Sequence, residues 1–181
     1  MVTAYFTGKG DDGTTGILSG VRVSKSDKLI AAIGDIDELN SSIGVALSEI
    51  EDESLKGGLR SIQNDLFVIG ADLASADSKK AGKAPKKRTA ILRLESGITE
   101  LSGKTPDLKK FVLPGGSRGS SCLHMSRAVA RRAERSVISA SKDYKINREI
   151  IAYLNRLSSY LFAAAVYLNH AKGIKESNPT Y

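Results

Sequence analysis

The sequence lacks much of the chemistry on which many small proteins depend. It contains one cysteine, Cys122, two histidines and no tryptophan. These counts exclude an intrachain disulfide, zinc ribbons, CxxC redox motifs and histidine-rich metal sites. Long apolar runs are also absent, because charge or glycine interrupts each one before the ~20 residues that span a bilayer. With no secretory signal visible, the sequence predicts a cytoplasmic protein that does not enter a membrane.

Acidic residues are outnumbered by basic ones. Over 181 residues, 27 Lys and Arg face 20 Asp and Glu, a net charge of +7. This balance favours an anionic partner, which could be nucleic acid, a membrane surface or the phosphates of a nucleotide. Aromatic residues make up only 6% and are not interleaved with basic runs, which disfavours a platform for single-stranded nucleic acid. The lysine-rich stretch 79–88 is interpreted as a solvated surface loop.

Helical periodicity dominates the chain after residue 27. The first 27 residues are rich in glycine and predict a loop. Apolar residues spaced by three and four then predict five helices, beginning at Leu29 with Asp27 as N-cap and continuing over 59–73, 88–101, 120–141 and 147–172. The sequence therefore predicts one all-α domain over 1–181, with a five-helix bundle over 28–172 and a frayed tail over 173–181.

The glycine-rich loop has the composition of an anion-binding segment. Glycines, threonines and a lysine alternate over 7–16, and glycine backbones can turn their N–H groups toward one anion. The order is not that of a Walker A loop, because Thr14 follows Gly13 where the lysine should stand. The segment alone fits either a flexible arm or an anion cradle, to which Lys25 could contribute.

Four arginines cluster on the predicted helix 120–141. At about 100° per residue, Arg127, Arg131 and Glu134 lie on the border of its apolar face, whereas Arg132 points toward solvent. Two arginines one turn apart repel each other unless an anion lies between them. The cluster is therefore either a salt-bridged surface or a ligand site.

Polar residues also interrupt the apolar faces of two other predicted helices. Asp37 flanks the first face and Asn40 lies inside it, while Asn155 and Ser158 interrupt the last one. Core-facing polar groups need partners, and Asp37 could accept from an arginine of the cluster, within the chain or across an oligomer interface. A di-iron bundle is excluded because no histidine follows a glutamate by three residues, so His124 is expected to be a partly buried helix histidine.

Four separated segments resemble the PduO-type corrinoid adenosyltransferases, which transfer the 5′-deoxyadenosyl group of ATP to cob(I)alamin. The resemblance covers nearly the whole chain. It rests on the loop 7–16 with Val23-Ser24-Lys25, on Gly34-Asp35-Ile36-Asp37-Glu38-Leu39-Asn40-Ser41, on 111–117 leading into 127–135, and on Tyr153-Leu154-Asn155-Arg156-Leu157-Ser158.

The resemblance implies a homotrimer with active sites between neighbouring subunits. It assigns ATP, bound with Mg²⁺, to Thr7, Gly8, Lys9, Gly10, Thr14, Thr15, Lys25, Arg131, Glu134, Arg135 and Asn155, with no metal ligand from the protein. It pairs Arg127 with Asp37 across the interface. It places Phe111 against the lower face of the corrin ring, where the axial ligand is displaced. Arg131, Phe111, Asp37 and Arg127 are thus expected to be catalytic.

Two other functions remain open from the sequence. One is a catalytically weak carrier of corrinoid and ATP, and the other is a basic helical module that binds nucleic acid or a protein. An active transferase would have a flavin reductase and an adenosylcobalamin-dependent enzyme as partners, and no nucleic acid.

Overall fold

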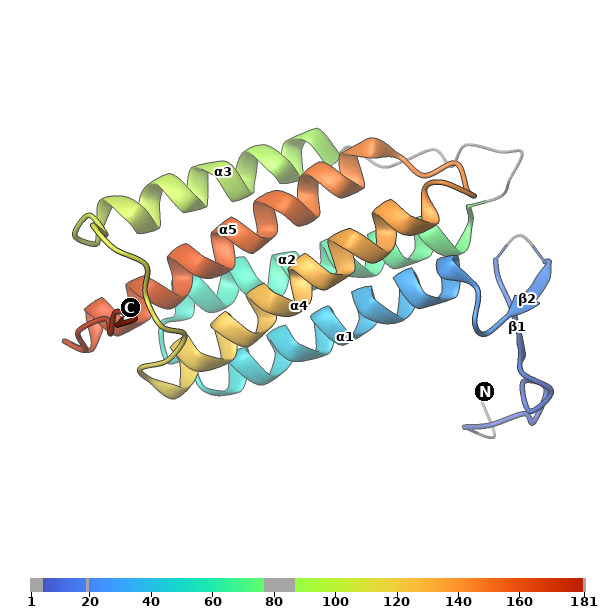
Figure 1. Cartoon of the computed structure of the whole chain (residues 1–181), viewed down its shortest axis with the longest axis horizontal. Helices are drawn as coiled ribbons and strands as arrows, with labels where there is room; N and C mark the ends of the chain where they lie inside the picture. Colours follow the sequence, from blue (N-terminus) through green and yellow to red (C-terminus); the bar gives the residue numbers. More distant parts are fainter. Residues whose placement is uncertain (1–4, 19, 77–86, 181) are drawn as a thin grey trace.

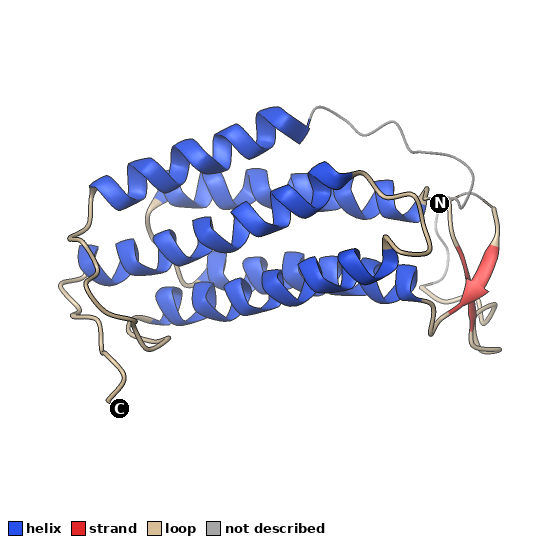
Figure 2. Ribbon diagram, turned by 45° about the horizontal axis from the view of Figure 1, so that its top comes forward, coloured by secondary structure: helices blue, strands red, loops and turns tan. Residues whose placement is uncertain are grey.

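The protein folds into a bundle of five long helices with a short hairpin at one end (Figures 1 and 2). The computed structural model describes residues 5–18, 20–76 and 87–180. The expected five-helix bundle is confirmed, and the lysine-rich stretch up to residue 86 lies outside the described residues. The elements are β1 (Thr14–Gly16), β2 (Arg22–Ser24), α1 (Lys28–Ser48), α2 (Glu53–Ala74), α3 (Lys87–Gly103), α4 (Arg118–Ala140) and α5 (Arg148–Ala171).

Polar N-caps set where the helices begin. The Asp27 carboxylate accepts from the Leu29 amide at 2.7 Å, which confirms the predicted cap of α1. Asp52 and Asn147 cap α2 and α5 in the same way. Ser117 caps α4, so this helix begins at Arg118, earlier than the predicted start at residue 120.

The helices pack side by side in the order α2, α1, α4, α5, α3. Each inner face carries apolar residues at helical spacing, and Leu39, Leu59, Leu123 and Leu154 are fully buried between neighbours. Consecutive helices α2 and α3 are not a closely packed pair, so the bundle is open between them. Among the described residues no helix is both long enough and apolar enough to span a membrane.

The N-terminal loop contains a hairpin that the sequence did not predict. β1 and β2 pair in antiparallel register with Thr15 opposite Val23. Strands of three residues are too short to show the alternation by which a strand is recognised. The Leu18 amide donates to the Ala74 carbonyl at 2.9 Å, which joins the hairpin to the end of α2.

The described part of the C-terminal tail, up to residue 180, has no helix or strand, and hydrogen bonds attach it to the bundle. The Leu113 amide donates to the Ser177 carbonyl at 2.7 Å, and the Asn178 side chain donates to the Phe111 carbonyl at 2.8 Å. The Asn169 amide reaches Glu176 at 3.0 Å. Because these contacts are polar and the tail has no apolar repeat, periodicity could not reveal them.

Candidate active site

A cavity of about 470 Å³ lies between α4, α5 and the segment before α4. It brings together three of the predicted site residues, Phe111, Arg127 and Arg131. The other lining residues are Leu108, Lys110, Val112, Ser158, Ser159 and Phe162. The Ser158 hydroxyl donates to the Asn155 carbonyl of its own helix at 2.9 Å and is therefore already hydrogen-bonded. Apolar side chains make up much of the remaining wall, and the arginines and Lys110 give it a cationic edge.

Arg127 is a partly buried cation without a complete set of partners. Its Nε is buried and donates to no acceptor among the described residues. His124, one turn earlier on α4, is 3% exposed, and its ring packs edge-on against Phe162 at 5.9 Å between centroids. Burial, followed by the charge of Arg127, lowers the pKa of His124, so the imidazole stays neutral. A buried guanidinium needs an anion, and the described part of the chain supplies none here.

Asp37 has an exposed carboxylate with no hydrogen bond or ion pair to the described residues. The pairing of an α4 arginine with α1 is instead made by Arg132, whose Nε donates to Asp35 at 3.1 Å and which also contacts Glu38. Arg132 is exposed, as predicted, with 44% of its side chain open to solvent, and it makes these ion pairs at the surface. Arg127 and Asp37 do not meet within one chain.

The residues next to Arg131 form a polar extension of this site. The Asn155 amide on α5 donates to the Glu134 carboxylate on α4 at 3.1 Å. Arg135 donates to the Arg131 carbonyl at 3.0 Å. Arg131 itself is exposed at the cavity and makes no side-chain ion pair with the described residues. Its guanidinium is thus available to an anionic ligand.

The glycine-rich loop folds into a compact set of turns. Gly8 and Gly13 have φ angles of 69° and 80°, which other residues rarely adopt. The Lys25 amide donates to the Gly13 carbonyl at 2.9 Å, and a Cβ on Gly10 would lie 3.0 Å from the Lys25 Nζ. The loop and Lys25 therefore lie together, as an anion cradle requires. Thr7 accepts from the Lys9 amide at 3.4 Å, whereas Thr15 lies in β1.

Two residues of this loop were missed by the sequence analysis. Arg22 donates to the Lys9 carbonyl at 2.6 Å and to the Thr14 hydroxyl, and Asp12 accepts from the Thr14 amide at 2.9 Å. The hydrogen bond from the Thr14 amide is the largest cause that lowers the pKa of Asp12. Only the pairing of β1 with β2 brings Arg22 back to the loop, and that pairing left no periodic signal.

The loop and the cavity lie apart in one chain. In Figure 1 the hairpin stands beyond the start of α1, whereas the yellow segment that leads into α4 lies at the other end of the bundle. Over the described ranges, no hydrogen bond or ion pair joins residues 7–16 to α4 or α5. No group of three or more His, Cys, Asp and Glu side chains with metal-site geometry occurs among the described residues.

Comparisons with known proteins agree on one family. A family model described as cobalamin adenosyltransferase matches residues 5–168. The chain is 42% identical to a corrinoid adenosyltransferase of Bacillus subtilis, over 93% of this chain and 88% of that protein. It is 38% identical to a corrinoid adenosyltransferase of Bos taurus, over 98% and 75% of the two chains.

A solved structure has the same fold. It is a variant of a PduO-type ATP:corrinoid adenosyltransferase from Lactobacillus reuteri in complex with cobalamin and ATP. The TM-score is 0.92 at 36% identity, with 97% of this chain and 96% of that chain covered.

Proposed function

Because the chain belongs to the cobalamin adenosyltransferase family and is an ATP:corrinoid adenosyltransferase, we propose that it transfers the 5′-deoxyadenosyl group of ATP to the Co(I) of cob(I)alamin and releases triphosphate. The observation that carries this proposal is the cavity in which an exposed aromatic ring, Phe111, lies with the two arginines Arg127 and Arg131. An apolar surface suits a corrin ring, and the guanidinium of Arg131, which has no ion pair to the described residues, suits a phosphate.

The ATP site combines two groups of residues. The glycine-rich loop and the neighbouring Lys25 surround the triphosphate, and Mg²⁺ enters with the nucleotide. The residues are Thr7, Gly8, Lys9, Gly10, Thr14, Thr15 and Lys25. The α4 and α5 cluster of Arg131, Glu134, Arg135 and Asn155 completes it. The folded loop beside Lys25 and the Asn155–Glu134 hydrogen bond support this assignment. The carboxylate of Glu134 accepts from the Asn155 amide, which holds it on the α5 side of the cluster.

The reaction asks the protein for position and charge rather than for a base. Co(I) of the corrinoid substrate attacks C5′ of the ribose, the C5′–O bond breaks, and triphosphate leaves with both electrons of that bond. Cationic side chains stabilise the developing charge, and holding the two substrates in line lowers the entropic part of the barrier. Phe111 displaces the lower axial ligand of cobalt, which makes reduction of Co(II) to Co(I) easier.

The active site is completed by a neighbouring subunit of a homotrimer, in which Asp37 of one chain pairs with Arg127 of another. Three observations support this arrangement. The Nε of Arg127 and the carboxylate of Asp37 have no partner within the described ranges, and the loop lies apart from the cavity. Charge reversal tests it. Asp37→Arg and Arg127→Asp should each reduce both activity and trimer content in sedimentation, and the double variant should recover both. A double variant no better than the singles would contradict the pairing.

The experiment that tests the function is an anaerobic assay with chemically reduced cobalamin and MgATP. A light-sensitive cobalt–carbon product formed with stoichiometric triphosphate supports the transferase. Binding of both substrates without product would favour a carrier. Salt-sensitive binding of DNA without binding of MgATP would favour the nucleic-acid module. A cytoplasmic location, a flavin reductase that supplies Co(I) and an adenosylcobalamin-dependent enzyme that receives the product are parts of the same proposal.

A further inference from the structure

Asn169 is a buried amide on α5 that hydrogen-bonds two other segments of the chain. Its side chain is in a residue only 1% exposed. Its Oδ1 accepts from the Ser117 amide, and its Nδ2 donates to the Gly115 carbonyl and to Glu176, each at 3.0 Å. An amide side chain has two N–H groups to donate, and both are used here. Asn169 therefore joins α5 to the turn before α4 and to the C-terminal tail.

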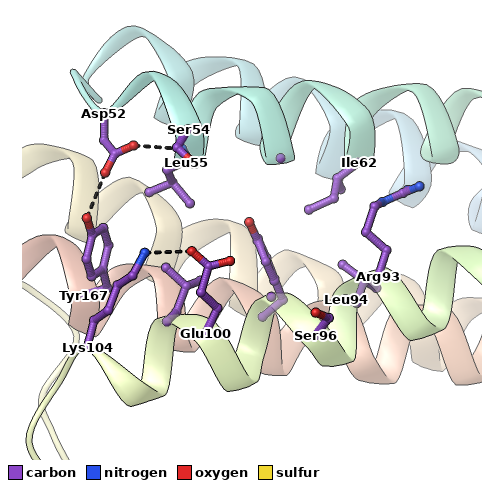
Figure 3. Close-up of a pocket in the computed structure, with 14 residues that line it drawn as sticks. Asp52, Ser54, Leu55, Ile62, Arg93, Leu94, Ser96, Glu100, Lys104 and Tyr167 are labelled. Atoms are coloured by element: carbon purple, nitrogen blue, oxygen red, sulfur yellow. Dashed lines mark hydrogen bonds and ion pairs between the residues drawn. The ribbon is translucent and has the colours of Figure 1, made fainter.

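The end of α5 that carries Asn169 is also fixed through another face of the helix. Tyr167, two residues earlier, lines a cavity of about 320 Å³ formed by residues of α2, α3 and α5 (Figure 3). Its hydroxyl donates to the carboxylate of Asp52, the N-cap of α2, at 2.8 Å. The backbone carbonyl of Asn169 accepts from the Ile174 amide at 2.9 Å. Asn169 is thus held by the bundle, so it can fix the segments that are bonded to it.

The turn before α4 fits closely around this amide. A Cβ on Gly116, whose φ is 102°, would overlap the Asn169 side chain, so the backbone of the turn passes directly over it. The Ser117 amide donates to no other acceptor among the described residues. The turn therefore depends on Asn169 both for its shape and for this hydrogen bond.

The tail extends this attachment to Phe111. Directly after the tail residue that Asn169 holds, the Ser177 carbonyl accepts from the Leu113 amide at 2.7 Å. The Asn178 side chain donates to the Phe111 carbonyl at 2.8 Å. The segment that leads into α4 is therefore tied to Asn169 at both ends, directly at its turn and through the tail at Phe111.

Phe111 depends on this backbone for its position. Its ring is 80% exposed, and residues 106–117 form no helix or strand. Because few neighbours surround the side chain, the main chain decides where the ring stands at the cavity. We propose that Asn169 is a positioning residue for Phe111, which fixes the backbone from which this ring projects. The role rests on the proposed function, in which Phe111 displaces the lower axial ligand of cobalt.

Asn169→Asp tests this role, because aspartate keeps the shape and the acceptor for Ser117 but loses the donors to Gly115 and Glu176. The full-length variant is assayed anaerobically with MgATP, from pre-reduced Co(I) and from Co(II) with reduced flavin as the one-electron donor. The rate from Co(II) should fall about tenfold more than the rate from Co(I), because small displacements of a positioned group change rates strongly. A partly unfolded protein would lose both rates equally. Equal losses, or no loss, overturn the proposal.

A second substitution should restore part of the lost attachment. In Asn169→Asp two carboxylates face each other, whereas Glu176→Gln supplies an amide that can donate to the new aspartate. The double variant should therefore recover most of the ratio of the Co(II) rate to the Co(I) rate. A ratio that stays at the value of Asn169→Asp overturns the proposal. Asn64→Asp adds the same charge at an exposed position of α2 and should leave both rates unchanged.

Two further measurements decide the matter if Asn169→Asp folds poorly. Glu176→Ala removes only the link to the tail and should lower the ratio of the two rates about threefold, as expected for one hydrogen bond. Deuterium uptake over residues 111–117 in this variant, without substrate, should rise above that of the wild type. An unchanged ratio or unchanged uptake overturns the proposal. A wild type that forms no product from either cobalt state contradicts the proposed function itself, and with it this role.

Discussion

The side-chain amide of Asn155 donates to the Glu134 carboxylate across the α4–α5 contact, at 3.1 Å. The bond orients the carboxylate beside Arg131, one turn earlier on α4. It also joins the two helices that line the Phe111 cavity. This polar contact between neighbouring helices holds Glu134 in place at the edge of the proposed site.

Removal of this contact should affect ATP more than folding. We expect Asn155→Ala and Glu134→Ala each to raise the KM for ATP about tenfold, because each leaves the other side chain unoriented. The double variant should lose little more than either single one, as residues that act as a unit are not additive. Steady-state kinetics with saturating cob(I)alamin measure this. Fully additive losses would show that the two residues act independently.

Arg131 and Arg132 are adjacent in sequence, but their replacement by alanine should affect kcat differently. Arg131 lines the cavity without a side-chain partner among the described residues, so Arg131→Ala should lower kcat at least 100-fold with little change in unfolding temperature. Arg132 pairs with Asp35 and Glu38 at a 44% exposed position. Arg132→Ala should therefore keep kcat and change the unfolding temperature little, because solvent screens the ion pairs of an exposed arginine. Unchanged activity in Arg131→Ala would remove Arg131 from the mechanism.

Phe111 should matter most when the reaction starts from Co(II). Phe111→Ala removes the ring that we propose displaces the axial ligand, so the rate from Co(II) should fall much further than the rate from pre-reduced Co(I). Phe67 is a matched control, since it is 73% exposed on α2 against 80% for Phe111. Phe67→Ala should leave both rates unchanged. Equal rates from Co(II) in Phe111→Ala and the wild type would contradict this role.

Gly116 should tolerate no side chain. Its φ is 102°, and a Cβ there would lie 2.2 Å from the Asn169 Oδ1. Asn169 cannot move freely, because it accepts from the Ser117 amide and donates to the Gly115 carbonyl, both at 3.0 Å. Gly116→Ala should lower the free energy of unfolding by about 2–4 kcal/mol in urea titrations. Gly115→Ala meets nothing within 4 Å and serves as the control.

His124 should make stability fall below neutral pH. Its pKa is lowered from 6.5 in the folded protein, so the unfolded chain binds the proton more readily. The stability is complete above about pH 6.5 and is lost as the pH falls from there through the folded-state pKa. His124→Gln should flatten this part of the profile, whereas His170→Gln, at an exposed position, should preserve it. Urea midpoints between pH 5 and 8 measure the difference.

The helices and their buried faces could be predicted from the sequence because both depend on local spacing. Apolar periodicity placed Leu29 and Leu154 in the core, and the same pattern identified Asn40 as a polar residue inside it, now 8% exposed. The cap of α1 was predicted because an N-cap acts within three residues.

The contacts of the site depend on pairs that are distant in sequence. Arg132 and Asp35 are 97 positions apart, and a helical projection shows the face of each residue but not the neighbouring helix. The contacts of Asn178 with Phe111 and of Arg22 with the loop also join residues that are not neighbours in the sequence. The cavity lined by residues of α2, α3 and α5 could not be predicted either, because it arises from two helices that follow each other and yet do not pack closely.

The hairpin joins the bundle mainly through its ends. Its strands pair with each other, and the Leu18 to Ala74 hydrogen bond links it to α2. Amide hydrogens in such a segment exchange with solvent through local opening, long before those of α1 or α4, which need the bundle itself to open. Nucleotide bound to the loop would suppress this local opening. Binding of ATP would therefore slow deuterium uptake over residues 7–25, while the exchange rates of the helices stay unchanged.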